Sequence, residues 1–132
     1  MRRCAPLLAL SLVLAGCSGA KSPTASPTAS ARATIAAAIR SAVHVQPGAH
    51  LDILRIRLSR DDPHFASAAI EPKSSGGEPT TDTGIVVLME SGGTWSVVIG
   101  PGTAFPEECK EPTPKPILQL MCPDPYKVLG VG

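Results

Sequence analysis

The chain has 132 residues, which is enough for one domain and not for two. Its formal net charge is +1. Twelve Lys and Arg residues stand against eleven Asp and Glu, so the composition argues against a nucleic-acid-binding protein. The aromatic residues are one Trp, one Tyr and two Phe. Any hydrophobic core is therefore small and mostly aliphatic.

The first residues have the physical pattern of an export signal. Arg2 and Arg3 precede an apolar run at positions 5–15, and a short positive segment before an apolar one is typical of secretory signals. As a helix the run would be roughly 16 Å long, about half the thickness of a bilayer core. We therefore expect a signal peptide and not a lasting transmembrane helix.

The sequence Leu14-Ala15-Gly16-Cys17 follows this apolar run directly. It resembles the lipobox of bacterial lipoproteins, which has a leucine, two small residues and a cysteine at this place. The resemblance implies that the sulfur of Cys17 receives a diacylglyceryl group. It also implies that residues 1–16 are cut off as a lipoprotein signal peptide. The alternative is a conventional signal peptide, cut after Ala20.

Lipidation of Cys17 would place the protein at a membrane without spanning it. Each methylene buried in the bilayer contributes about 0.8 kcal/mol to membrane binding. Two acyl chains anchor a protein stably, whereas one chain binds only marginally. We expect a lipid anchor in the cell membrane, with the domain on the extracytoplasmic face. Loss of Arg2 and Arg3 changes the basic count from twelve to ten against eleven acidic residues, a net charge of −1.

Residues 17–31 are predicted to be the lipidated cysteine and a flexible tether. The segment repeats SPTA at 22–25 and 26–29, and such a mixture of Ser, Pro, Thr and Ala buries too little apolar surface to offset the entropy of ordering. An O-glycosylated stalk is the alternative interpretation. The folded domain is then expected over 32–132.

A helix is predicted over residues 31–44. Ile35, Ile39 and Val43 fall on one helical face, and Ser30 is a suitable N-cap. A membrane-surface role is disfavoured because the helix has neither large apolar residues nor a lysine-rich face. We expect it to pack on the domain's own sheet.

In the next segment, residues 49–60, apolar and polar residues alternate as they do in a half-buried strand. Leu54, Ile56 and Leu58 are predicted to point inward, with Arg55 and Arg57 on the outer face. An arginine pair can bind a carboxylate or phosphate through bidentate hydrogen bonds. A solvated strand face is the simpler interpretation of the same pattern.

Three further strands are predicted. A weaker one covers 64–72, and a long polar loop at 73–84 is expected to be a mobile, solvated connection. The strongest hairpin pattern in the chain follows, with strands at 85–90 and 94–99 around a Ser-Gly-Gly turn.

Trp95 lies in the returning strand of that hairpin. Trp95, Val97 and Ile99 are predicted to share one face. A single tryptophan can stack on a sugar, but beside two β-branched residues we expect it to belong to the core.

Cys109 and Cys122 are the remaining cysteines of the mature chain. Outside the cytoplasm two such cysteines are expected to pair, and no CxxC or HxxxH spacing supports a metal site instead. Pro114 to Met121, between them, is predicted to be a short helix with Ile117, Leu118 and Met121 facing inward.

Catalytic signatures are missing from the sequence. It has no GxSxG, HExxH, P-loop or dinucleotide-binding pattern. Asp61, Asp62 and His64 lie close in sequence and are candidates for a metal or acid–base site, although histidines in polar turns are usually only solvated.

The predicted architecture is α+β, with an N-terminal helix on an antiparallel meander of about four strands and a disulfide-closed C-terminal segment. This order resembles cystatin-like and nuclear-transport-factor-like domains, which implies a fold and no activity. The mature domain also resembles small uncharacterised lipoproteins of high-GC bacteria, in which a similar hairpin and C-terminal cysteine pair recur.

The expected function is a non-enzymatic binding or accessory module of the cell envelope, without cofactor, metal or nucleic acid. Its partner would be an envelope protein or small ligand, and Arg55, Arg57 and Trp95 are the candidate contact residues. The alternatives are a small extracytoplasmic enzyme or metal-handling protein using Asp61, Asp62 and His64, or an inhibitor of a secreted hydrolase.

Overall fold

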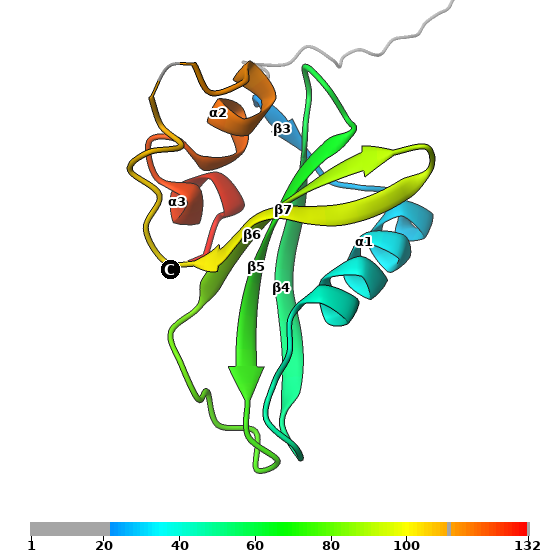
Figure 1. Cartoon of the computed structure of the whole chain (residues 1–132), viewed down its shortest axis with the longest axis vertical. Coiled ribbons are helices and arrows are strands. Elements are labelled where there is room, and N and C mark those ends of the chain that lie inside the picture. Colours follow the sequence, from blue (N-terminus) through cyan, green and yellow to red (C-terminus); the bar gives the residue numbers. More distant parts are fainter. Residues whose placement is uncertain (1–21, 111, 132) are drawn as a thin grey trace, which may run out of the picture.

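The structure, a computed structural model, describes residues 22–110 and 112–131. Its strands form one antiparallel sheet in the order β3-β4-β5-β6-β7. Figure 1 shows α1 on one side of this sheet and α2 and α3 on the other. The predicted α+β class is confirmed, with five strands where about four were expected. The elements in chain order are β3 Thr24–Ala25, α1 Ala29–Ala42, β4 His50–Ser59, β5 Phe65–Lys73, β6 Gly84–Ser91, β7 Thr94–Gly102, α2 Lys115–Met121 and α3 Pro125–Leu129.

Helix α1 is the predicted amphipathic helix, but it begins earlier than expected. Thr28 is the N-cap, and its side-chain oxygen accepts a hydrogen bond from the backbone N–H of Ala31 at 3.2 Å. The predicted cap, Ser30, lies inside the helix. Both residues can cap, and because the chain uses Thr28 the helix begins two residues earlier and also ends two residues earlier than predicted, at Ala42.

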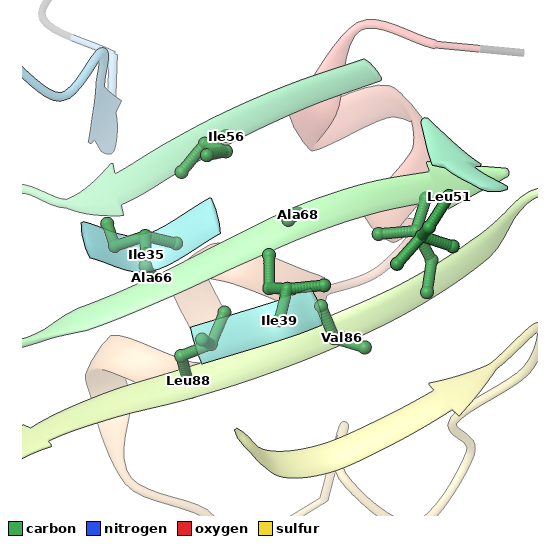
Figure 2. Packing of buried hydrophobic residues seen from close by; sticks show 9 residues of the cluster. Ile35, Ile39, Leu51, Ile56, Ala66, Ala68, Val86 and Leu88 are labelled. Carbon is green, nitrogen blue, oxygen red and sulfur yellow. The ribbon is translucent and has the colours of Figure 1, made fainter. Parts of the chain in front are cut away.

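The main core lies between α1 and the sheet. Ile35 and Ile39 of the helix are fully buried and pack against side chains from three strands, which Figure 2 shows from close by. The contribution of β5 to this cluster is mostly small side chains, Ala66 and Ala68. The strand residues in this cluster include Leu51, Ile56, Ala66, Ala68, Val86 and Leu88.

A β-bulge in β4 changes which side chains point inward. Ile53 pairs with Ile70 and Arg55 pairs with Ala69, so the register shifts at Leu54. Ile53 takes the core position and packs against the main cluster, whereas Leu54 is 41% exposed. The prediction that Leu54 points inward is therefore wrong, because the extra residue of a bulge shifts the alternation by one.

A second register shift divides β7 between the two faces of the sheet. Val97 pairs with Leu88, and Ile99 pairs with Val87, which leaves Val98 as the additional residue. Trp95 and Val97 pack against the α1 cluster, while Ile99 packs against the cluster on the other face. The prediction that these three residues share one face is therefore wrong.

The opposite face of the sheet is covered by the C-terminal helices. Val87 packs against Ile117, Leu120 and Met121 of α2. The predicted short helix is confirmed, but Leu120 is fully buried and Leu118 is only half-buried, although Leu118 was predicted to face inward. Helix α3 contributes Leu129, which packs on Ala69 and Ile85.

The connection between β5 and β6 folds back on β5. The N–H of Ser74 donates to the carbonyl of Glu78 at 2.8 Å, and the N–H of Thr80 donates to the carbonyl of Pro72 at 3.0 Å. Gly77 supplies the turn with a φ of +88°, a conformation that glycine adopts without strain. The loop predicted at 73–84 thus contains its own hydrogen-bonded turn.

Strand β3 makes part of the predicted tether a part of the domain. Thr24 pairs with Ser59 and Ala25 with Leu58, and Thr24 is only 1% exposed. The predicted tether at 17–31 therefore differs from the structure from residue 22 onward. Residues 17–21 lie outside the described residues.

Tyr126 connects α3 to the start of β6 and gives a testable pH effect. Its hydroxyl donates to the carbonyl of Thr83 at 2.8 Å. Burial raises the pKa of Tyr126, and the charges of Asp82 and Asp124 act in the same direction. A raised pKa means that the folded state favours the neutral phenol. The resulting stabilisation is complete below the unfolded pKa, about 10, and is lost as pH rises through the folded pKa.

We expect the Tyr126 phenol to ionise at a higher pH in the folded protein than in the unfolded chain. The chain has one tyrosine, so the absorbance of tyrosinate reports on Tyr126 alone. We also expect Tyr126→Phe to lower the free energy of unfolding by about 1 kcal/mol at neutral pH, because the bond to Thr83 is lost. A phenol that titrates as in the denatured chain would contradict the prediction.

Candidate functional site

The residues of the predicted acid–base or metal site do not converge. His64 and Asp62 do meet in the β4–β5 turn, where His64 Nδ1 lies 2.9 Å from Asp62 Oδ1. Asp61 turns toward α2 instead, and its Oδ2 lies 3.0 Å from Nζ of Lys115. Among residues 22–110 and 112–131 no group of three or more His, Cys, Asp or Glu is placed to hold a metal ion.

The charges in this turn are balanced locally. The hydrogen bonds from the side chain and the backbone of His64 lower the pKa of Asp62. The pKa of Asp61 is lowered chiefly by its hydrogen bond with Lys115. Each carboxylate therefore stabilises the turn or its contact with α2, and neither has the raised pKa that a general acid needs.

The side chain of Arg57 forms its hydrogen bonds within the domain. Its Nε donates to the hydroxyl of Thr24 at 3.0 Å, Nη2 donates to the carbonyl of Thr24 at 3.0 Å, and Nη1 donates to Ser26 at 3.0 Å. Partial burial is the main cause that lowers the pKa of Arg57, followed by the nearby charges of Arg55 and Arg60. Two of these hydrogen bonds thus fix β3 to β4, and the third holds Ser26, the residue after β3.

Arg55 lies on the same sheet face as Arg57, because the two are separated by one residue beyond the bulge. It is exposed, and its guanidinium lies beside Gly130 at the end of α3. Arg57 is thus engaged in hydrogen bonds within the domain, whereas Arg55 is exposed to solvent. Trp95, the third expected ligand contact, is half-buried against the α1 cluster on the opposite face.

The predicted disulfide is present. Cys109 and Cys122 are bonded, with Cα atoms 5.7 Å apart. Cys122 packs against the cluster formed by Val87 and α2, so the bridge fastens the segment before α2 to the end of that helix. Cys17, the predicted lipidation site, lies outside the described residues.

A groove lies beside this disulfide, and sequence reasoning did not find it. Its volume is about 610 Å³. Lys115 and Gln119 contribute polar atoms to it. We call it the disulfide groove; its other lining residues are Pro23, Leu118, Pro123, Val128 and the bonded pair Cys109 and Cys122. No motif predicts the groove, because Pro23 and the remaining walls are far apart in the chain.

A second hollow lies where α1 ends and β4 begins. It has a volume of about 420 Å³ and is lined by both apolar and charged side chains, among them Arg40, Val45, His50 and Asp52. Asp52 already pairs with Lys73 at 3.0 Å, and this hydrogen bond is the main cause that lowers the pKa of Asp52. The carboxylate of Asp52 at this rim is thus also paired within the domain.

Comparison with protein-family models, with curated proteins and with solved structures finds no match to this chain. In the part of the chain that the structure describes, no helix is long and apolar enough to cross a membrane.

Proposed function

We propose that this protein is an extracytoplasmic lipoprotein, anchored in the cell membrane through an acylated Cys17. The observation that carries the proposal is the sequence Leu14-Ala15-Gly16-Cys17 directly after a positively charged and then apolar segment. The bond between Cys109 and Cys122 supports it independently, because disulfides persist outside the reducing cytoplasm.

Within this proposal the domain is a non-enzymatic binding or accessory module of the envelope. The placement of the titratable side chains supports binding over catalysis. Asp61 pairs with Lys115, away from the contact between Asp62 and His64, so the three side chains that the enzymatic alternative requires do not share a site. The disulfide groove is a mainly apolar surface that a partner or lipid can contact.

The anchor is tested by mass spectrometry of the full chain expressed in a bacterium that processes lipoproteins. We expect the mature N-terminal peptide to begin at Cys17 and to carry a diacylglyceryl thioether, in the membrane fraction. Cys17→Ser should give an unacylated chain. Cys4→Ser is the matched control, because Cys4 lies in the segment that is removed, and it should leave processing unchanged.

Two results would refute the proposal. One is a wild-type Cys17 without lipid, and the other is an acylated, normally processed product from Cys17→Ser. Alkylation without reductant tests the compartment separately. Cys109 and Cys122 should not be labelled in the exported protein and should both be labelled after reduction.

A further inference from the structure

The first strand that the structure describes, β3, lies close in sequence to Cys17. The carbonyl of Pro23 accepts a hydrogen bond from the N–H of Arg60 at 2.9 Å, and β3 starts at Thr24. Six residue steps separate Cys17 from Pro23 (23 − 17 = 6), and at 3.3–3.6 Å per residue they reach at most about 22 Å. A domain of about 100 residues has a radius of gyration of about 13 Å, so its diameter exceeds this reach. The end of the domain that holds Pro23 therefore stays beside the anchor.

The disulfide groove lies at this same end. Pro23 is itself one of its walls. Figure 1 shows β3 and α2 at one end of the molecule, and the hydroxyl of Ser59 on β4 bonds Oε1 of Gln119 on α2 at 2.6 Å. The half-buried side chains of Leu118 and Val128 thus present their apolar surface beside the point where the chain leaves toward Cys17.

Charged side chains of both signs lie near this apolar surface, since Glu108 precedes Cys109 in the chain and Asp124 follows Pro123. Lys115 in the groove wall is 75% exposed, Arg60 is exposed next to Pro23, and Lys127 precedes Val128 in the chain and is exposed. A basic residue near an anionic membrane surface contributes about 1 kcal/mol to binding. Lys115 also pairs with Asp61, so we expect apolar contact to be the larger part of the interaction.

We propose that the face carrying the disulfide groove rests against the phospholipid surface in which Cys17 is anchored. This inference rests on the proposed lipidation of Cys17 and goes further, because it gives the domain a fixed orientation on the membrane. The opposite sheet edge, β7, then points away from the membrane. Strands lie about 4.8 Å apart, so β7 is at most roughly 19 Å from β3, measured along the sheet.

Quenching of tryptophan fluorescence by brominated lipid tests this orientation. The chain has one tryptophan, so Trp95→Phe gives a background without tryptophan. Val128→Trp in that background places the reporter in the groove. Val98→Trp places the same substitution on β7, where Val98 is 44% exposed, and is the matched control. The acylated full chain is reconstituted in phosphatidylcholine vesicles with and without bromine on the acyl chains.

We expect bromine to quench the reporter at position 128 and to leave the reporter at position 98 unchanged. Lys115→Trp is a second groove reporter at an exposed site, in case Val128→Trp does not fold. Equal quenching at positions 98 and 128, or none at either, would overturn the orientation. A groove reporter that is shielded from water but not quenched would overturn it too, since the groove would then hold the lipid of Cys17 itself.

The lipidation of Cys17 is tested separately from the orientation of the domain. Mass spectrometry of the same vesicles shows whether Cys17 is acylated. An acylated chain with an unquenched groove reporter refutes the orientation alone. A chain without lipid on Cys17 refutes both the orientation and the proposed function.

Discussion

Replacing Cys109 and Cys122 together by serine is expected to lower the free energy of unfolding by about 3 kcal/mol. The bond closes a loop with a sequence separation of 13, and without it the unfolded chain gains the entropy of that loop. The loop contains α2, which has seven residues and is too short to be stable alone. A small domain has only about 5–15 kcal/mol of total stability, so the effect should be large.

Urea unfolding with and without reductant measures this effect. Reductant should lower the midpoint of the wild-type protein and should not move that of the double variant. A second pair, Cys109→Ala with Cys122→Ala, separates loss of the bond from the introduction of hydroxyl groups beside Val87 and α2. A wild-type midpoint that does not respond to complete reduction would contradict the prediction.

Replacing Ile39 by alanine is expected to lower the free energy of unfolding by about 3 kcal/mol. Ile39 is fully buried in the main cluster, and Figure 2 shows it on α1, over the strands that carry Ala68 and Val86. Removing most of its side chain leaves a cavity under α1 that the rigid sheet cannot fill.

Two variants calibrate this measurement. Ile39→Val removes one methylene and should lower the free energy of unfolding by about 1 kcal/mol. Ala37→Ser lies on the exposed side of the same helix and should change it by no more than about 0.5 kcal/mol. Fluorescence of Trp95, which packs on the same cluster, follows unfolding in all of them. An Ile39→Ala variant as stable as Ala37→Ser would contradict the assignment of this core.

Periodic segments of the chain predicted the fold well. The helix with Ile35 and Ile39 and the hairpin around Ser91-Gly92-Gly93 both have patterns that a short window contains in full. The register shifts at Leu54 and Val98 could not be predicted in the same way. Alternation shows that a strand is present, but it does not say where one residue is added to it.

Strand β3 shows a different limit of sequence reasoning. Its composition indicates a disordered segment, yet hydrogen bonds from Arg57, 33 residues away from Thr24, hold it to the sheet. Such pairing depends on tertiary contacts that no local pattern contains. For the same reason the disulfide groove could not be predicted from the sequence. The pairing of Asp61 with Lys115, and not with the neighbours of Asp62, also depends on tertiary contacts.

Strand β3 also determines how a mechanical load enters the domain. If the protein is anchored through Cys17 as proposed, a pull on the anchor would act first on β3, which has two paired residues at the edge of the sheet. These pairs and the bonds from Arg57 would open before force reached β4 and the core behind it. Segments at the ends of a fold open locally at low free energy and close again. We therefore expect the edge strand to detach and reattach under load while the four longer strands stay intact.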